Sequence, residues 1–430
     1  MNPHPSLETI EIELEKAGKA GKKRKAATYC IKGKEKDILQ DYSIDGRNFG
    51  ILCRRSLIGY RRDSMGGRRR ARELGIAIGS LETGNHNAIT DVEGVGVGHS
   101  TIIHGDGPLR IGEGPIRTGV TAIVPHQGNP YEEKVIGAVD VFNAYGKSVG
   151  LLQVAHMGTI ETPILLTDTL NTWLVADALV SYMYEVYGVR ALSINPVVGE
   201  TNGGFLNDSI GRHVRKCHVF EALDRARDPE GRGAVAEGNV GGGTPMSAFG
   251  FKGGIGTASR KTDSFTLGVL VQLNCGRKED LRIDGVPVGR ELTDPAIPSS
   301  EEGGSVIIIL ATDLELTSRQ LWKVLRRTFL GIARIGHYGN VGSGDYAIGF
   351  TTGRRNLLEA FGIDVDEEKR RFLREEGYLD LVFRAAVEAT EEAALNALFM
   401  AETMVGRDGN KREEIPIDRV REILEKYGRI

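Results

Sequence analysis

Ser305 is the residue whose setting best suits chemistry. It follows Gly304 and stands directly before a continuous apolar run, 306–310, which predicts a buried central strand. A serine hydroxyl is a weak nucleophile unless a base lies beside it. If the chain is cut before Ser305, the new α-amino group can be that base, because its pKa is about 8 against about 10.4 for lysine. Gly304 and Ser305 therefore form a candidate self-cleavage site, with Ser305 as the candidate nucleophile for amide bonds.

The residues before Ser305 suit a cut. Glycine at position 304 tolerates the strained backbone that an N-to-O acyl shift requires. The segment 292–304 has the sequence LTDPAIPSSEEGG. Its Pro, Ser and Gly residues are typical of a surface loop. A second interpretation is a flexible peptide that must be cut and moved aside.

A glycine-rich loop over 238–244 offers a different chemistry. Bare backbone amides can cradle a phosphate. Neither G-x-G-x-x-G in a strand–helix context nor G-x-x-x-x-G-K-[ST] is present, however. The residues 146–148 imitate the end of the second motif, but Val141 stands where its first glycine belongs. A nucleotide-binding protein is therefore a distant alternative.

The nine histidines do not form a recognisable ligand set. His99 and His104 are five residues apart, as are His213 and His218, and neither pair has an H-E-x-x-H motif or a cysteine partner. We expect no metal and no cofactor.

Strands and helices alternate along the chain from residue 71, which predicts an α/β fold with one continuous core. Short apolar or alternating runs predict strands over 88–99, 120–124, 149–155, 189–198, 264–274, 306–310 and 345–352. Apolar residues at helical spacing predict helices over 163–187, 318–335 and 378–404, and a last helix after Pro416. These elements must bring the groups that assist Ser305 to its side.

Residues 1–70 form a basic leader that differs from the rest of the chain. Its 17 Lys and Arg against 9 Asp and Glu give a net charge of +8, which leaves −11 for the remainder of a chain with a total of −3. We interpret it as disordered or as a misassigned start, with Met65 as an alternative first residue, in preference to a nucleic-acid arm. The hydrolase domain is expected to span 71–430.

The composition favours a cytoplasmic protein. Four cysteines without a C-x-x-C pair indicate a reducing compartment. No apolar run reaches the roughly 18 residues of a membrane span, and the first 25 residues lack the apolar core of a signal peptide. Neither a membrane nor a nucleic acid is expected as a partner.

Seven motifs, in order over most of the body, resemble the DmpA-type family of L-aminopeptidase/D-esterases and β-aminopeptidases. The resemblance runs from about residue 70 to about residue 401. The matching stretches are 87–95 (NAITDVEGV) with 97–99 (VGH), 195–202 (NPVVGETN), 240–244 (VGGGT), 250–257 (GFKGGIGT), 268–274 (GVLVQLN), 304–313 (GSVIIILATD) and 342–345 (GSGD). The leader has no counterpart in the family.

This resemblance implies a four-layer αββα sandwich made as one precursor. Cleavage before the nucleophile gives a large subunit part, 71–304, and a small subunit, 305–430. The two chains stay associated, usually within a homotetramer. The resemblance implies no cofactor and an aminopeptidase or amidase that acts on short peptides, amides or esters. An endo-type amide hydrolase or acyltransferase on the same scaffold is the alternative.

The resemblance also assigns roles to single residues. Ser305 is the nucleophile, and Asn274 supplies an oxyanion-hole donor. Ser343 and Asp345, two apart at a strand start, support the nucleophile and its amine. Glu200 holds the free amino group of the substrate.

Two positions depart from the family pattern. Asn202 stands where well-studied aminopeptidases of the family carry a tyrosine near the reaction centre, and it is counted with the substrate-binding residues. Pro245 interrupts the glycine loop where a glycine is expected.

Overall fold

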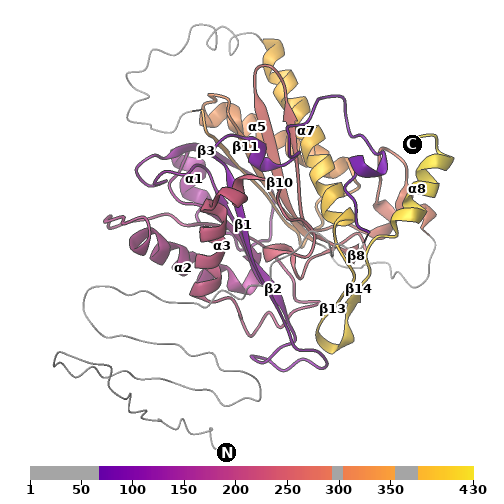
Figure 1. The fold of residues 1–430 in the computed structure, drawn as a ribbon, viewed down its shortest axis with the longest axis horizontal. Coiled ribbons are helices and arrows are strands. Elements are labelled where there is room, and N and C mark those ends of the chain that lie inside the picture. Colours follow the sequence, from indigo (N-terminus) through magenta and orange to yellow (C-terminus); the bar gives the residue numbers. More distant parts are fainter. Residues whose placement is uncertain (1–66, 293–303, 354–375) are drawn as a thin grey trace, which may run out of the picture. The chain divides into compact units, whose positions relative to one another are not determined.

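Two β-sheets form the middle of the fold (Figure 1). The computed structural model describes residues 67–292, 304–353 and 376–430, which fall in one compact unit. The larger sheet has the order β4-β3-β12-β11-β10-β9, formed by Thr159–Ile160, Val135–Ala144, Gly344–Thr351, Ser305–Thr312, Thr266–Asn274 and Gly254–Lys261. The smaller sheet has the order β1-β2-β5-β6, formed by Gly96–His104, Ile116–Val124, Ile164–Asp168 and Val197–Thr201.

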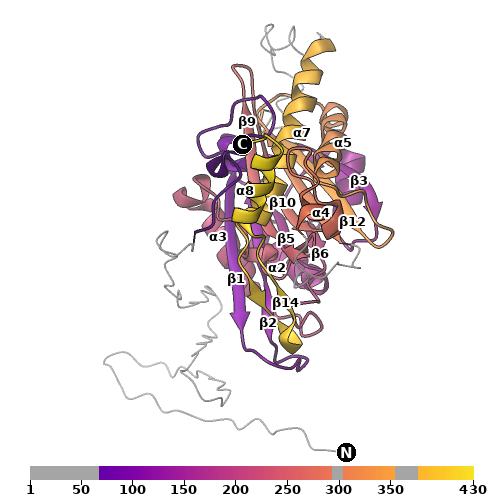
Figure 2. The same cartoon turned by 90° about the vertical axis from the view of Figure 1, so that its right-hand side faces the viewer.

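Helices cover the outer face of each sheet (Figure 2). Helices α5 (Ser318–Arg334) and α7 (Glu376–Phe399) pack on the six-stranded sheet. Helices α2 (Thr172–Glu185) and α3 (Lys216–Arg227) pack on the four-stranded sheet. A third apolar cluster fills the space between the sheets. These layers confirm the predicted αββα sandwich.

Strand β11 shows why its sequence is apolar at every position. Val306, Ile308 and Leu310 belong to the core beneath α5 and α7. Ile307 and Ile309 belong to the core between the sheets. Side chains alternate between the two faces of a strand, so a strand covered on both faces must be apolar throughout.

The strand register fixes the position of Ser305. Strands β10 and β11 pair antiparallel, with Asn274 opposite Ser305. Strands β11 and β12 pair in parallel, with Val306 opposite Asp345. Three predicted site residues therefore lie on neighbouring strands at one edge of the larger sheet.

Four predicted elements are wrong in type or extent. The segment 88–99 begins with the 3-10 turn η3 (Ile89–Asp91), and strand β1 starts only at Gly96. The segment 149–155 is not a strand, because Leu151–Met157 forms α1, which follows Gly150 in a left-handed conformation. The segment 163–187 begins with the buried strand β5 before α2 starts. The segment 189–198 becomes a strand only at β6. Short apolar runs occur in helices and strands alike, so their pattern does not decide between them.

Two arginines of the predicted leader contact the body. Arg70 pairs with Glu237 (Nε to Oε2, 2.8 Å), and its Nη2 donates to the carbonyl of Thr257 at 2.6 Å. Arg68 Nη1 donates to the carbonyl of Ile415 at 3.0 Å. Residues 1–66 lie outside the described part of the chain.

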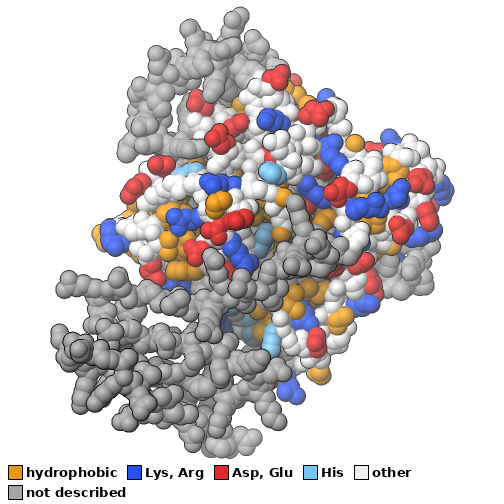
Figure 3. All heavy atoms as spheres, viewed as in Figure 1, with side chains coloured by type: hydrophobic (Ala, Val, Ile, Leu, Met, Phe, Trp, Pro, Cys, Tyr) orange, Lys and Arg blue, Asp and Glu red, His pale blue; other side chains and the backbone are white. Residues whose placement is uncertain are grey.

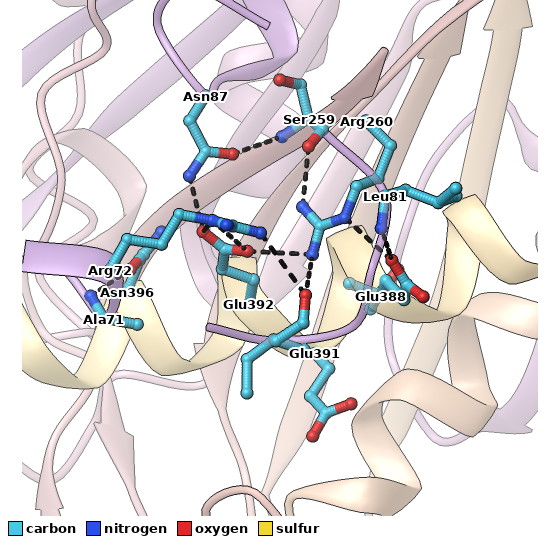
Figure 4. Close-up of polar contacts among 12 residues, drawn as sticks. Ala71, Arg72, Leu81, Asn87, Ser259, Arg260, Glu388, Glu391, Glu392 and Asn396 are labelled. Carbon is cyan, nitrogen blue, oxygen red and sulfur yellow. Dashed lines mark hydrogen bonds and ion pairs between the residues drawn. The ribbon is translucent and has the colours of Figure 1, made fainter. Parts of the chain in front are cut away.

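A buried ionic cluster links residues of the predicted large-subunit part, 71–304, to helix α7 of the predicted small subunit (Figure 4). Arg260 on β9 is fully buried and pairs with Glu388 at 3.2 Å and Glu392 at 2.9 Å. Arg72 pairs with Glu392 at 2.9 Å, and Asn87 Nδ2 donates to the same carboxylate at 2.5 Å. Each buried carboxylate thus has both a cation and a hydrogen-bond donor, as buried charges require.

The surface and the helices of the described residues add two observations. On the face in Figure 3, Lys and Arg side chains are interspersed with Asp and Glu. None of the helices in the described ranges has the length and apolar character needed to cross a membrane.

Candidate active site

A pocket of about 330 Å³ opens at the edge of the larger sheet where β10 ends and β11 begins. Its wall includes four of the predicted site residues together with Gly304: Ser305, Asn274, Glu200 and Asn202. The sequence therefore predicted a set of residues that are separated along the chain and come together in space.

Ser305 begins β11 and is partly exposed at the pocket wall. Its Oγ accepts a hydrogen bond from the backbone amide of Gly344 at 3.0 Å. Among the described residues, no histidine hydrogen-bonds to this hydroxyl. A base for Ser305 must therefore come from another group.

Gly304 is required for space. A Cβ at this position would lie 1.9 Å from the carbonyl oxygen of Asn274 and 2.4 Å from Cα of Cys275. Its φ is not among the positive values of the described glycines. Position 304 therefore needs glycine because two backbones approach closely there. The reason suggested by the sequence, tolerance of a strained backbone conformation, does not apply. This approach holds the bond before Ser305 against the end of β10.

Asn274 ends β10 and is buried. Its Oδ1 accepts from the amide of Ser247 at 2.8 Å, and its Nδ2 donates to the carbonyl of Asn202 at 3.1 Å. These two bonds distinguish the oxygen from the nitrogen of the Asn274 side-chain amide. The second N–H of Nδ2 can donate to an oxyanion that forms next to Ser305.

Asp345 and Ser343 lie together behind Ser305. Their side chains are 2.7 Å apart (Oγ to Oδ2), as expected for residues two apart at a strand start. The other oxygen of Asp345 accepts from the amide of Val306 at 3.2 Å. Asn143 Nδ2 donates to Ser343 Oγ at 2.9 Å. The Asp345 carboxylate is fully buried. The amide that it accepts from belongs to Val306, the residue directly after Ser305, whose nitrogen is the candidate α-amine.

His337 is the residue that the sequence analysis missed. Its Nε2 lies 3.1 Å from Asp345 Oδ2, and the ring is buried. Burial alone lowers the pKa of His337, but Cys275 and Asp345 outweigh burial and raise it to about 10. The ring is therefore charged at neutral pH. No motif in the sequence distinguishes this histidine from the other eight.

Glu200 occupies a different wall of the pocket, on β6 of the smaller sheet. One carboxylate oxygen accepts from the amide of Lys147 at 2.5 Å, and the other accepts from the Thr169 hydroxyl. The pKa of Glu200 is raised above its ordinary value, chiefly by burial. The hydrogen bonds from Thr169 and Lys147 act in the opposite direction, and the nearby Asp168 raises the pKa further. A cation bound beside this carboxylate would stabilise its charged form.

The two departures from the family pattern are neighbours. Asn202 lines the pocket, and its Oδ1 accepts from the amide of Gly204 at 2.8 Å. Gly203 has no room for a side chain, because a Cβ there would lie 2.3 Å from Cγ of Pro245. Pro245 therefore packs against the turn that carries Asn202.

The glycine loop is a packing element. The amide of Gly241 donates to Thr101 Oγ1 at 2.8 Å, and that of Gly242 donates to Thr121 Oγ1 at 3.1 Å. The Gly243 amide donates to the carbonyl of Val240 at 2.9 Å. The first two bonds tie the loop to β1 and β2 of the smaller sheet, and the third lies within the loop. These amides are therefore not available to a phosphate, and the loop does not support the nucleotide-binding alternative.

Within the described ranges, no group of three or more His, Cys, Asp or Glu side chains could hold a metal ion. Besides Ser305, the pocket wall carries the side-chain amides of Asn202 and Asn274, the Glu200 carboxylate, and the cations Lys147 and Arg412.

The αββα layers and a serine at the start of a central strand define a hydrolase of the N-terminal-nucleophile fold class. Residues 87–412 match the model of peptidase family S58. The chain belongs to this family, and it is a hydrolase of peptide bonds.

Three similar proteins support this assignment. The β-peptidyl aminopeptidase BapA of Sphingosinicella microcystinivorans is 38% identical over 379 residues, which cover 84% of this chain and 93% of that protein. The PH0078 protein from Pyrococcus horikoshii OT3 has a solved structure with 46% identity and a TM-score of 0.76, covering 84% of this chain and 100% of that one. The L-aminopeptidase D-Ala-esterase/amidase from Ochrobactrum anthropi is 39% identical with a TM-score of 0.75, covering 84% and 99%. That protein is described as a serine aminopeptidase with a variant of the Ntn hydrolase fold. The predicted family and its aminopeptidase-type activity are confirmed.

Proposed function

We propose that this chain is a self-processing aminopeptidase whose nucleophile is Ser305 and whose catalytic base is the α-amine of that residue. It releases N-terminal residues from short peptides, amides or esters. The observation that carries the proposal is the position of Ser305, opposite Asn274 in the sheet and in one pocket with Glu200.

Processing begins when Ser305 Oγ attacks the carbonyl carbon of Gly304. The peptide C–N bond breaks as the ester bond to Oγ forms, and the Ser305 nitrogen takes up the hydroxyl proton. Water then hydrolyses the ester, which gives a new carboxyl terminus at Gly304 and restores the hydroxyl. The products are 1–304 and 305–430, and they remain joined by the pairing of β10 with β11.

The mature enzyme uses the same atoms on substrate. The α-amine of Ser305 takes the hydroxyl proton as Oγ attacks the scissile carbonyl, and Asn274 Nδ2 donates to the oxyanion. The amine then gives the proton to the leaving nitrogen, and water hydrolyses the acyl-enzyme. One oxyanion donor of this kind is typically worth about 3 kcal/mol of transition-state stabilisation.

Asp345 and Ser343 position the amine in this proposal. Their side chains hydrogen-bond to each other, and Asp345 also holds the amide next to the candidate amine. The rate should rise with pH as the amine loses its proton, with an apparent pKa at or below about 8.

Glu200 selects substrates with a free amino group. Its buried carboxylate gains most from an ammonium ion, which supplies charge and hydrogen-bond donors together. An endo-type hydrolase or acyltransferase would not need this group. Equal turnover of free and N-acetylated substrates by the wild-type enzyme would therefore favour the alternative.

Denaturing mass spectrometry of the purified protein tests the processing step. We expect two chains from the wild type and one chain from Ser305→Ala. An active wild-type enzyme that remains one intact chain would overturn the proposed mechanism.

Kinetics on matched substrates tests the role of Glu200. Glu200→Gln keeps the shape and removes the charge, so it should lower kcat/KM for free-amine substrates about 10- to 100-fold, since a hydrogen bond to a charged group contributes about 1.5–3 kcal/mol. It should change turnover of N-acetylated substrates far less.

A homotetramer in the cytoplasm completes the proposal. Exposed apolar side chains gather near α5 and the turn before β12, where Phe142 stacks on Phe329 with ring centres 5.3 Å apart. Leu330 and Tyr338 are both 55% exposed in this region, and such exposed side chains are typical of an assembly surface. Neither of the two described cysteines, Cys217 and Cys275, is in a disulfide, which fits a reducing compartment. Light scattering of the processed enzyme tests the assembly.

A further inference from the structure

His337 is held against Asp345 by the turn that ends α5. Gly336 in this turn has a φ of 104°, and a Cβ there would lie 1.9 Å from the carbonyl oxygen of Asp280, so the turn requires glycine. The amide of His337 then donates to the carbonyl of Ile332 at 3.3 Å. The residue is 4% exposed, and its Nε2 lies 3.1 Å from Asp345 Oδ2. The chain therefore places a buried histidine beside a carboxylate of the candidate active site.

The two oxygens of Asp345 have different partners. Oδ1 accepts from the amide of Val306, the residue directly after Ser305, at 3.2 Å. Oδ2 faces both His337 Nε2 at 3.1 Å and Ser343 Oγ at 2.7 Å. This carboxylate thus connects the His337 ring to the backbone next to the candidate α-amine.

Ser343 alone does not secure the orientation of Asp345. A hydroxyl has one proton to donate, and the carbonyl of Asn340 lies 2.8 Å from Ser343 Oγ as an alternative acceptor. When the proton points to Asn340, His337 is the remaining side-chain donor to Oδ2 in the described ranges. A charged N–H also makes the stronger hydrogen bond to a carboxylate. His337 therefore supplies the more dependable of the two donors.

The charge of the ring has its own consequence. Burial lowers the pKa of His337, but Cys275 and then Asp345 outweigh burial and raise it to about 10. The ring is therefore positive at neutral pH, and it offsets the charge of a carboxylate that is fully buried. Without this offset, a carboxylate near the α-amine would favour the ammonium form, which cannot act as a base.

We propose that His337 is a positioning residue that acts through Asp345. Its positive charge lets the carboxylate orient the α-amine of Ser305 without holding that amine protonated, so that the amine accepts the hydroxyl proton near neutral pH. His337 is not part of the pocket wall, so it does not act on the substrate directly. The inference rests on the proposed function, in which the α-amine is the base.

Other titratable and charged groups surround the site. They are the pocket residues Tyr145, Lys147, Glu200, Cys275 and Arg412, and Tyr346 next to Asp345 on β12. Cys275 interacts with the His337 ring. Burial and then Glu200 raise the pKa of Tyr346, so its hydroxyl stays neutral at the working pH. The amine of a free peptide substrate titrates near pH 8 as well. The quantity to follow is therefore kcat at saturating substrate, because the substrate amine is then already bound.

The test measures kcat against pH on the processed enzyme with one peptide substrate. Wild-type kcat should rise through an apparent pKa at or below about 8. His337→Gln keeps an N–H and removes the charge, so this apparent pKa should rise by about one pH unit, since a neighbouring opposite charge moves a pKa by about 1–3 pH units. Below the apparent pKa, kcat should then be about tenfold lower than in the wild type, whereas KM and kcat on the alkaline plateau should stay within about twofold.

Three control variants isolate the charge of His337. His337→Lys keeps a cation and should retain the wild-type apparent pKa. His99→Gln removes a histidine of β1 whose ring bonds to Thr121 in the smaller sheet, and it should leave the profile unchanged. Cys275→Ser should keep the rise of kcat with pH. Loss of that rise in Cys275→Ser would assign it to the thiol and overturn the proposal.

The outcomes separate this inference from the proposed function. An unchanged apparent pKa in His337→Gln, or an equal loss of kcat at every pH, would overturn the role of His337 and leave the α-amine mechanism intact. A wild-type kcat that does not rise with pH would refute the α-amine mechanism, and this inference with it. If His337→Gln does not process, His337→Lys decides. Processing of His337→Lys with the wild-type profile would support the role of the charge, and failure to process would refute it.

Discussion

Replacing His337 by glutamine should change how stability depends on pH. The ring lies 3.1 Å from Asp345. Burial lowers the pKa of His337, but Cys275 and then Asp345 outweigh burial and raise it from 6.5 to about 10. Glutamine offers an N–H at similar reach but cannot take up a proton. The variant therefore separates the charge of His337 from its hydrogen bond.

The expected size follows from the pKa. A rise from 6.5 to about 10 is about 3.5 in pKa, which at 1.36 kcal/mol for each unit of pKa gives at most about 5 kcal/mol. Because the folded-state pKa is the higher one, this stabilisation is complete below pH 6.5 and declines until pH reaches about 10. Relative to His337→Gln, the free energy of unfolding should fall by about 1.4 kcal/mol per pH unit between pH 7 and 9.5.

The assay is urea unfolding at a series of pH values. Both proteins should carry Ser305→Ala, so that each is a single uncleaved chain. Parallel stability curves for His337 and His337→Gln across pH 7–9.5 would refute the reasoning, because they would show no proton taken up by His337 on folding.

A second histidine provides a control with the opposite sign. Burial, and then Arg225, lowers the pKa of His99 to about 4. Its folded-state pKa is the lower one, so the protein should lose stability relative to His99→Gln as pH falls from 6.5 to about 4. The difference in unfolding free energy caused by His99→Gln should therefore change with pH below 6.5, and the difference caused by His337→Gln should change with pH above 6.5.

Three further predictions follow from packing. Gly304→Ala should block or strongly slow self-cleavage, because its Cβ would lie 1.9 Å from a carbonyl oxygen of β10; fragment formation over time in mass spectrometry measures this, and cleavage at the wild-type rate would show that the close approach is not needed. A chain starting at Met65 should process and hydrolyse normally, whereas one starting at Ala71 should melt at a lower temperature, because it lacks the arginines that bind the body; equal melting temperatures would contradict this. Arg260→Met should lower the free energy of unfolding by about 3–5 kcal/mol, because it leaves two buried carboxylates without this cation; chemical denaturation measures the loss, and a change below about 1 kcal/mol would show that the remaining partners suffice.

Local sequence indicated the candidate nucleophile Ser305 and the strand that follows it. The apolar run after Ser305 has no polar position, as a strand covered on both faces requires. The pair Ser343 and Asp345 also follows from local geometry, since residues two apart at a strand start reach the same side. The αββα layers came from the family resemblance, because alternation of helices and strands alone fits several α/β architectures.

Short segments were the least predictable. The segment 149–155 became a helix, and 163–187 was divided between β5 and α2. Apolar residues in such runs are buried in either conformation, so the neighbours against which they pack decide the outcome.

Tertiary structure alone decided the surroundings of Ser305. The register of β10 on β11 brings Asn274 opposite Ser305, and the close backbone approach there explains Gly304. His337 reaches Asp345 from outside any motif, and Arg412 joins the pocket from the far end of the chain. The spacing of apolar residues along a helix or strand indicates which of its faces is buried, because residues close in the sequence form that face. Which distant side chains meet depends on strand register and on the packing of whole layers, and these are set only when the chain is folded.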